Sequence, residues 1–166
     1  MHQLHGFDKS LIKLINKIGH KRRNLMLVIT TAGSGPIVGL IIVASTLLLH
    51  SSGGRFYHAA LLVTVCTPLV LVFKLLARRV RRDTIYVRNM IYQSYSFPSG
   101  HAYGSMLVYG FLAYLSAIWL IYVVFGILIL LIGSSRVYLG AHYPSDVIGG
   151  WLLALITLSV ILNYTL

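Results

Sequence analysis

The stretch SGHAYGSMLVYGFLAYLSAIWLIYVVFGILILLIGSSRVYL, residues 99–139, is a long and almost uninterrupted apolar run. A helix needs about 20 apolar residues to cross a hydrocarbon core that is roughly 30 Å thick. The run is too long for one such helix, so it predicts two membrane-spanning helices joined by a tight turn near Ser116–Trp119. This helix pair indicates a polytopic helical membrane protein.

The composition of the whole chain also indicates a membrane protein. Hydrophobic residues make up 57% of the 166 residues and charged residues only 10%, whereas soluble domains average about 45–50% and about 25%. We expect an all-α, polytopic transmembrane helical bundle of about five spans, formed as one core by residues 24–166. The expected spans are residues 25–49, 59–77, two within 99–139, and 146–164.

Residues 1–23 precede the first span and have a different pattern. Leucines and isoleucines recur there at helical spacing, with lysines at positions 9, 13, 17 and 21 between them. This pattern is typical of an amphipathic helix that lies in the membrane interface. A signal peptide is the alternative, but the apolar run after Arg23 is too long for one and no small-residue cleavage site stands out.

The charge balance limits the kind of site that the chain can build. Lysine and arginine total 14, the acids are only Asp8, Asp83 and Asp146, and the net charge is +11. So few carboxylates argue against a divalent-metal cage, because hard cations take several carboxylate oxygens. The positive charge favours an anionic partner, either lipid headgroups or a phosphorylated substrate. A nucleic-acid partner is disfavoured, because the cations do not lie on a soluble surface with interleaved aromatic residues.

Three polar clusters interrupt the apolar sequence. The first is Lys74 and Arg81, which are seven residues apart and would lie on one side of a helix. The second is PSGH, residues 98–101, at the start of the long apolar run. The third is SRVYLGAHYPSD, residues 135–146, which ends with a histidine and an aspartate four residues apart.

The second cluster suits an anion. Pro98 favours the start of a helix, and the free N–H groups of Ser99, Gly100 and His101 would then point at a negatively charged group. Glycine also lets that group approach the backbone closely. The cations that could hold the oxygens of a phosphate at this turn are Arg81, Arg136 and Lys74.

The third cluster suits catalysis. His142 and Asp146 stand at i and i+4, so the carboxylate can hold one ring nitrogen while the other nitrogen faces a substrate. Together with His101, they would allow one histidine to attack phosphorus and the other to protonate the leaving oxygen. Ionisable residues at the boundary of a span are costly and usually mark a functional site.

Other polar residues favour structural interpretations. The arginines of residues 78–82 most often mark membrane topology, and PSGH could be an ordinary helix cap. The glycines at 33–35 and 149–150 indicate helix packing rather than nucleotide binding. The histidines interpreted as surface or interfacial are His2, His5, His20, His50 and His58. The residues expected in the interfacial belt, with headgroup contact as the alternative, are Tyr86, Arg88, Tyr92 and Tyr95.

Taken in order, the three clusters resemble the type 2 phosphatidic acid phosphatase family, which is related to bacterial non-specific acid phosphatases and vanadium haloperoxidases. The family pattern is Lys, six residues, Arg-Pro; then Pro-Ser-Gly-His; then Ser-Arg, five residues, His, three residues, Asp. The second and third elements match at every specified position. The first matches at Lys74 and Arg81 but has Arg82 in place of the proline, so Arg82 is the alternative phosphate ligand.

The resemblance implies a metal-independent lipid phosphatase that needs no cofactor. By position in the motifs, His142 would be the nucleophile, Asp146 would orient it, and His101 would be the general acid. The residues that would bind the substrate phosphate are Lys74, Arg81, Ser99, Gly100, Arg136 and, as the alternative to Arg81, Arg82. No metal ligands are expected.

We therefore expect hydrolysis of a lipid monophosphate or diphosphate in the membrane through a phosphohistidine. The substrates that the resemblance implies are phosphatidic acid, phosphatidylglycerophosphate, polyprenyl diphosphates and phosphorylated prenyl-linked sugars. A lipid-to-acceptor phosphotransferase is the enzymatic alternative. A non-catalytic subunit that binds anionic lipids is the other alternative, but such a role would not require both histidines and the aspartate. The oligomeric state is left open.

The distribution of lysine and arginine predicts an orientation in the cell membrane. With five spans, the N-terminal helix, the 78–97 connection and the 140–146 segment share one face, which carries 13 of these cations, whereas the other face carries only Arg55. The positive-inside rule places the first face, and with it the site, in the cytoplasm. The periplasmic or extracellular face is the alternative, because family members that act on lipid carriers commonly face that side.

Overall fold

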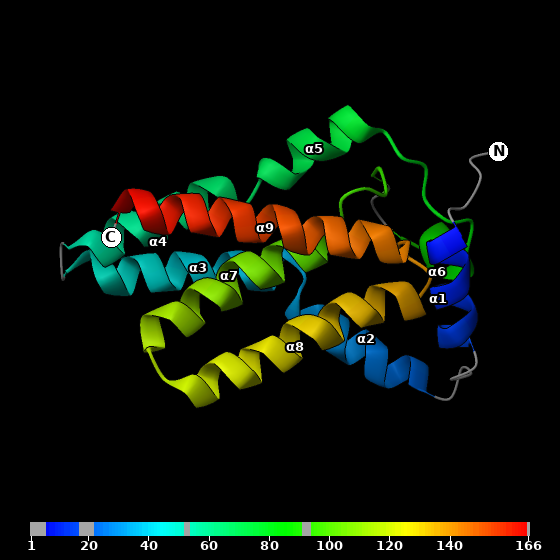
Figure 1. Cartoon of the computed structure of the whole chain (residues 1–166), viewed down its shortest axis with the longest axis horizontal. Helices are drawn as coiled ribbons and strands as arrows, with labels where there is room; N and C mark the ends of the chain where they lie inside the picture. Colours follow the sequence, from blue (N-terminus) through cyan, green and yellow to red (C-terminus); the bar gives the residue numbers. More distant parts are fainter. Residues whose placement is uncertain (1–5, 17–21, 52–53, 91–93, 166) are drawn as a thin grey trace.

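The computed structural model describes residues 6–16, 22–51, 54–90 and 94–165. The regular elements in these ranges are helices, which confirms the expected all-α bundle. In chain order they are α1 (Gly6–Asn16), α2 (Arg23–Ala32), α3 (Gly35–His50), α4 (Arg55–Cys66), α5 (Leu69–Ala77), α6 (Ile85–Arg88), α7 (Gly100–Ser116), α8 (Trp119–Tyr138) and α9 (Pro144–Thr165). Most of the longer helices run along the long axis of the molecule (Figure 1).

Four stretches of the described chain are long and apolar enough to cross a membrane. They are Arg23–His50, Arg55–Ala77, Trp119–Tyr138 and Pro144–Thr165. The fifth expected span corresponds to α7, which has 17 residues and is about 26 Å long at a rise of roughly 1.5 Å per residue. Nine of these 17 residues are buried, so α7 lies at the centre of the bundle. The turn expected near Ser116–Trp119 is present at Ala117, whose φ is 52°.

Both N-terminal spans are interrupted. The first is divided between α2 and α3 at Gly33, where the sequence predicts close packing or a kink. A Cβ atom at Gly33 would lie 2.4 Å from Cγ2 of Ile132, so glycine here allows α2 to pack directly on α8. The second span is divided between α4 and α5 at Thr67 and Pro68, a break that our sequence analysis does not predict. Pro68 lacks the N–H group that would continue the helix.

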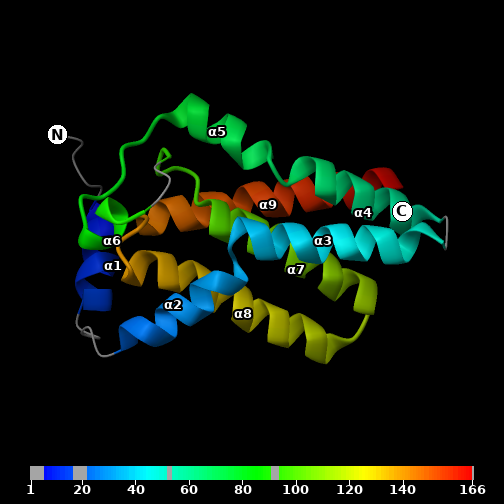
Figure 2. The ribbon, with the colours of Figure 1, turned by 180° about the vertical axis from the view of Figure 1, so that it is seen from behind.

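Helix α5 leaves the bundle after this break. Figures 1 and 2 show it diverging from α4 and α9 towards the end of the molecule that carries α1 and α6. Its side chains Leu71, Leu75 and Leu76 are exposed, as expected for a helix that faces lipid. Lys74 is the charged residue of α5, and it is buried. The helix therefore places the ammonium group of Lys74 inside the protein.

The N-terminal helix α1 lies across one end of the bundle, beside α6 and the ends of α8 and α9 (Figure 1). Ile12 and Ile15 pack against a buried cluster on α7, α8 and α9, whereas Phe7 and Leu14 are exposed. The described part of the helix expected over residues 1–23 is α1. Residues 1–5 and 17–21, with His2, His5 and His20, lie outside the described residues, as does Tyr92.

Helix α9 packs on the start of α7 through small residues. A Cβ atom at Gly150 would lie 2.7 Å from the carbonyl oxygen of Ser99, and one at Gly149 would lie 2.3 Å from the ring of Phe97. The glycines 33, 149 and 150 therefore allow close packing, as expected, whereas Gly35 has open space around its Cα. This contact brings the first turn of α9 beside the segment that precedes α7.

Candidate active site

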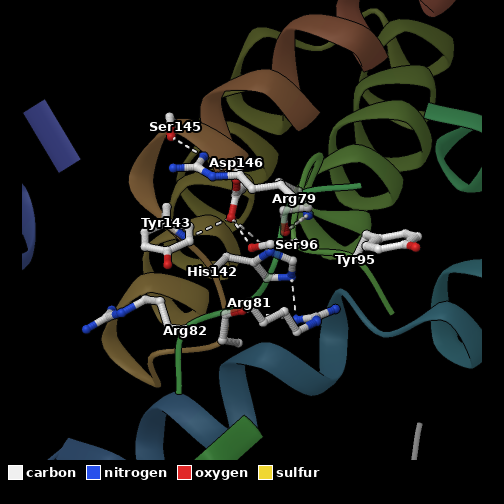
Figure 3. A network of polar contacts seen from close by, with 12 residues as sticks. Arg79, Arg81, Arg82, Tyr95, Ser96, His142, Tyr143, Ser145 and Asp146 are labelled. Carbon is white, nitrogen blue, oxygen red and sulfur yellow. Dashed lines mark hydrogen bonds and ion pairs between the residues drawn. The ribbon is translucent and has the colours of Figure 1, made fainter. Parts of the chain in front are cut away.

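The three polar clusters of the sequence meet at the end of the bundle that α1 covers. Four of their ionisable side chains are buried, and these are Lys74, Arg136, His142 and Asp146. Buried charges are costly unless they are paired, so this cluster must be satisfied internally or serve a function. Figure 3 shows His142 between Asp146 on one side and Arg81 on the other.

Asp146, in the first turn of α9, is held by several donors. Its Oδ2 accepts hydrogen bonds from the backbone N–H of Tyr143 at 2.8 Å and from the hydroxyl of Ser96. The same oxygen lies 3.5 Å from Nδ1 of His142, which is longer than a normal hydrogen bond. The carboxylate is thus fixed in place, and Nδ1 is a buried nitrogen directed at it with no hydrogen-bond partner at normal distance.

The second ring nitrogen of His142 contacts Arg81. Nη1 of Arg81 lies 3.2 Å from Nε2 of His142. Arginine is only a donor, so Nε2 accepts this hydrogen bond and His142 is neutral, with its proton on Nδ1 facing Asp146. The Nε2 lone pair is therefore directed into a cluster of cations.

The surroundings of His142 stabilise this neutral form. Burial, together with the charges of Arg81, Arg136 and Lys74, lowers the pKa of His142 to about 4, although the interaction with Asp146 acts in the opposite direction. Burial and the charge of Arg136 also lower the pKa of Arg81. At neutral pH the imidazole is thus unprotonated and able to act as a nucleophile.

Backbone carbonyl groups hold Lys74 and Arg81 at the site. Nζ of Lys74 donates to the carbonyl oxygen of Tyr95 at 2.6 Å. Nε of Arg81 donates to the carbonyl oxygen of Ser94 at 2.7 Å, and its Nη1 donates to that of Ala141 at 3.0 Å. Within the described residues, neither cation forms an ion pair with a carboxylate, so both keep their positive charge available to an anion.

The expectation that Lys74 and Arg81 share one side of a helix is wrong. Helix α5 ends at Ala77, and Arg78 adopts a left-handed conformation with φ of 47°. The chain then runs without helical structure to Thr84. The two cations meet because this extended segment turns back along residues 94–96, where the backbone N–H of Ser96 donates to the carbonyl oxygen of Arg79 at 2.7 Å.

The PSGH turn differs in part from the expectation. The helix begins at Gly100 rather than at Pro98, and Ser99 is its N-cap, with its hydroxyl accepting from the N–H of Ala102. The N–H of Ser99 donates to the carbonyl oxygen of Asp146 at 2.9 Å, so it does not point at an anion. In the described part of the chain, the N–H groups of Gly100 and His101 have no such partner.

His101 and Lys74 lie next to this helix start. A Cβ atom at Gly100 would lie 4.0 Å from Cε of Lys74, which places the lysine against the glycine. His101 is within electrostatic range of His142, Arg136, Arg81 and Lys74. Its side chain makes no hydrogen bond to the described residues, so both nitrogens are available for proton transfer.

Arg136, on the last turn of α8, is the most enclosed of the cations. Its Nη1 donates to Oγ1 of Thr30 at 2.7 Å and to the hydroxyl of Tyr86 at 3.1 Å, and its Nε is buried without a partner. The guanidinium also lies over the Tyr86 ring, 5.4 Å from its centroid. Thr30 was not predicted as a site residue, and Tyr86 was expected in the aromatic belt. Their sequence positions give no signal for this contact.

Arg81 and Arg82 point in different directions. Figure 3 shows Arg81 under His142 and Arg82 extending to the opposite side. Among the described residues, the hydrogen bond of Arg82 is a long one, from Nη1 to the carbonyl oxygen of Val137 at 3.5 Å. Arg88, expected in the interfacial belt with headgroup contact as the alternative, forms an exposed ion pair with Asp83, in which Nη2 and Oδ2 are 2.6 Å apart. The contacts of Arg81 favour it over Arg82 as the phosphate ligand.

Two further charged residues, Asp8 and Arg79, lie at the site but were not predicted. Nη1 of Arg79 lies 2.7 Å from Oδ1 of Asp146, and its Nη2 lies 2.9 Å from Oδ2 of Asp8. Burial would lower the pKa of Arg79, but the hydrogen bond to Asp8 and the charges of Asp146 and Asp8 outweigh it, so this pKa is raised. The arginine cluster of residues 78–82 is thus more than a topology signal.

The fold and the site together define an integral-membrane helical protein with a buried histidine–aspartate pair in a cluster of cations. Residues 53–166 match the family model of the PAP2 superfamily. This match covers more than half of the chain, and the protein therefore belongs to the PAP2 superfamily. The resemblance that the three motifs indicate is confirmed.

Individual relatives agree with this assignment. The chain is 40% identical over 72 residues to phosphatidylglycerophosphatase B of Bacillus subtilis (strain 168), and the match spans 38% of this chain and 36% of that protein. The crystal structure of a transmembrane PAP2-type phosphatidylglycerolphosphate phosphatase from Bacillus subtilis superimposes with a TM-score of 0.76 at 27% identity, covering 99% of this chain and 87% of the other. Aquifex aeolicus LpxE shares the fold, with a TM-score of 0.74 at 22% identity and 99% of both chains covered.

Proposed function

We propose that the protein is a membrane lipid phosphatase that hydrolyses a lipid monophosphate or diphosphate through a phosphohistidine on His142. The observation that carries this proposal is the neutral His142, with Asp146 at its Nδ1 and a cation at its Nε2. A buried nucleophile that faces preorganised positive charge suits attack on phosphorus, because the developing negative charge is stabilised where it forms.

In the first step, the Nε2 lone pair of His142 attacks phosphorus as the bond from phosphorus to the lipid oxygen breaks. Arg81 leaves Nε2 and joins Lys74 and Arg136 on the phosphate oxygens, with the N–H groups of Gly100 and His101 beside them. The negative charge of the bound phosphate offsets the surrounding cations, so His101 holds a proton in the complex and gives it to the leaving lipid oxygen. Asp146 stabilises the positive charge that His142 acquires.

In the second step, water replaces the histidine on phosphorus. His101, now neutral, takes a proton from the attacking water, and the bond from phosphorus to Nε2 breaks. Inorganic phosphate leaves, and His142 returns to its neutral form. The distance of 3.5 Å between Nδ1 and Asp146 shortens as His142 gains positive charge, since hydrogen bonds between charged groups are shorter than those of neutral groups.

A cavity next to the cations favours a lipid substrate. Its volume is about 770 Å³, and Lys74 and Arg81 line it together with the apolar side chains Leu71, Leu75 and Val80. His142 does not line this cavity, but Arg81 contacts both. A lipid phosphate that draws Arg81 away from Nε2 of His142 would therefore reach this nitrogen, while the apolar chain of the lipid stays beside α5.

Phosphatidylglycerophosphate is the first substrate to test, because two relatives from Bacillus subtilis are named for its phosphatase activity. The other candidates are phosphatidic acid, polyprenyl diphosphates and phosphorylated prenyl-linked sugars. We place the site on the cytoplasmic face of the cell membrane, because the face with the site carries 13 of the 14 lysines and arginines. Labelling of an Asn89→Cys, Cys66→Ala protein from outside intact cells would refute this orientation.

The first experiment measures phosphate release by the purified protein in detergent with EDTA present. The panel contains the four candidate lipid classes, and His142→Ala is the matched control. We expect release from at least one lipid in the presence of EDTA and none from the variant. Phosphate that remains covalently bound to the wild-type protein after the reaction is quenched, and that acid then releases, would identify the phosphohistidine.

Two outcomes would contradict this function. Phosphate that appears only when a second lipid acceptor is added would indicate a phosphotransferase. A folded protein that binds these lipids but releases no phosphate from any of them would indicate a non-catalytic binding subunit.

A further inference from the structure

Helix α1 carries a completely buried carboxylate at the candidate active site. Asp8 has 0% exposure, although Phe7 beside it is 53% exposed and Leu14 is 60% exposed. A helix that only rested on the membrane surface would direct its acid towards water. Burying a carboxylate without partners would be strongly unfavourable, so the contacts of Asp8 must compensate for the loss of water.

The partners of Asp8 are two residues that lie far away in sequence. Oδ1 accepts from the backbone N–H of Ser145 at 2.9 Å, and Oδ2 accepts from the Ser145 hydroxyl at 2.8 Å. Oδ2 also accepts from Nη2 of Arg79 at 2.9 Å. Ser145 is the residue directly before Asp146, so both partners of Asp8 adjoin the residue that contacts the nucleophile.

Arg79 connects Asp8 to Asp146. Its Nη2 donates to Asp8, and its Nη1 donates to Oδ1 of Asp146 and to the hydroxyl of Ser145, each at 2.7 Å. The guanidinium is also placed over the Tyr143 ring, 4.1 Å from the centroid. Figure 3 shows Arg79 against Asp146 on the side away from Arg81. One planar cation thus bridges two carboxylates, and the second carboxylate faces His142.

We propose that Asp8 is a positioning residue for the reaction at His142, acting through Arg79 and Asp146. This inference rests on the proposed function. With Asp8 present, the charge of Arg79 is shared between two carboxylates, and Asp146 keeps negative charge for the imidazolium that forms during attack. Without Asp8, the full charge of Arg79 acts on Asp146 alone and competes with His142 for it. Helix α1 is then part of the catalytic machinery rather than only a membrane contact.

A purely structural role predicts a different result. If Asp8 only anchors α1 through Ser145, its removal lowers the stability of the protein and leaves the reaction of the folded fraction unchanged. If Asp8 positions Asp146, its removal changes the ionisation and reactivity of His142 in protein that is still folded. The experiment must therefore measure both the unfolding temperature and the reaction.

The test compares Asp8→Asn with Ser10→Lys in detergent. Both changes raise the formal charge of α1 by one, but Ser10 is exposed and its hydroxyl donates to the carbonyl oxygen of Gly6 within the same helix. We expect Asp8→Asn to lower kcat about tenfold, the smaller end of the effect seen when partners that orient a functional histidine are removed. The KM should change less than kcat, and the acid limb of the pH profile should move. Ser10→Lys should retain the kcat and pH profile of the wild type.

A double variant keeps the inference testable if Asp8→Asn is less stable. Arg79→Gln removes the bridge from its other end, so Asp8→Asn combined with Arg79→Gln should lose no more activity than Arg79→Gln alone. All proteins are assayed below their measured unfolding temperatures. An unchanged kcat and pH profile in folded Asp8→Asn, or losses that add in the double variant, would overturn the inference.

Binding of orthovanadate separates this inference from the proposed function. This tetrahedral anion accepts a fifth ligand from a nucleophile, so its affinity reports on His142 without turnover. We expect Asp8→Asn to weaken vanadate binding about tenfold. Wild-type protein that binds vanadate but hydrolyses no lipid would refute the proposed function, and the effect of Asp8→Asn on vanadate binding would still decide the inference.

Discussion

Gly150→Ala tests the packing that connects α9 to the start of α7. A Cβ atom at this position would lie 2.7 Å from the carbonyl oxygen of Ser99, 3.1 Å from Cβ of Ala102 and 3.2 Å from the backbone nitrogen of Tyr103. Non-bonded atoms attract at about 3.5 Å or more, so the helices must separate by about 0.8 Å. The obstacles are backbone atoms and a Cβ, which cannot move by a change of rotamer.

The separation should affect both stability and activity. Overpacking of a well-packed interior costs about 1–3 kcal/mol, which corresponds to roughly 2–12 °C in the unfolding temperature of a protein of this size. The same contact holds Asp146 through its carbonyl oxygen, which accepts from the N–H of Ser99 at 2.9 Å. A displacement of several tenths of an ångström at the proposed catalytic pair of His142 and Asp146 should lower kcat, since catalysis depends on near-attack geometry.

Gly126→Ala is the matched control for this variant. Gly126 lies within α8, and a Cβ atom there would meet nothing within 4 Å. Alanine is favoured over glycine inside a helix by about 0.5–1 kcal/mol, so this variant should be at least as stable as the wild type. Thermal unfolding in detergent and phosphate release are measured for both variants. A Gly150→Ala protein with wild-type stability and kcat would refute the close contact between α7 and α9.

Two further predictions concern the electrostatics of the site. Burial and the nearby cations lower the pKa of His142 to about 4, so the imidazole stays neutral well below pH 6.5. The value of kcat/KM, corrected for ionisation of the substrate phosphate, should therefore fall only as the pH drops through about 4. A fall of kcat/KM near pH 6.5 would contradict a buried imidazole. Arg81 contacts Nε2 of His142, whereas the hydrogen bond of Arg82 in the described part of the chain goes to a carbonyl oxygen. Arg81→Lys should therefore lower kcat/KM about 10- to 100-fold through loss of the forked donor, and the loss in Arg82→Lys should be less than a tenth as large. Equal losses in the two variants would show that both arginines share the role.

The helical membrane fold and the family could be predicted from local sequence. Apolar runs of at least 20 residues predict helices in lipid, because every backbone polar group must be satisfied within the segment. The order and spacing of Lys74, PSGH and the 135–146 motif indicate the family, and the match of residues 53–166 to the PAP2 superfamily confirms it. The break at Gly33 lies where a glycine and a proline occur close together, whereas the break at Pro68 lies in a run whose hydrophobicity alone predicts one continuous helix.

What the tertiary structure decided is how the charges are paired. Asp8 and Ser145 are 137 residues apart, Arg136 and Thr30 are 106 apart, and Arg79 and Asp146 are 67 apart. Helical periodicity describes neighbours three or four residues apart and cannot predict such contacts. For the same reason, the sequence could not indicate that the N–H of Ser99 is used by Asp146 or that α5 ends between Lys74 and Arg81. The sequence by itself determined which chemical groups the protein has. The packing of distant segments determined which of these groups touch, because a buried charge must be paired with a group that the fold places within hydrogen-bonding distance.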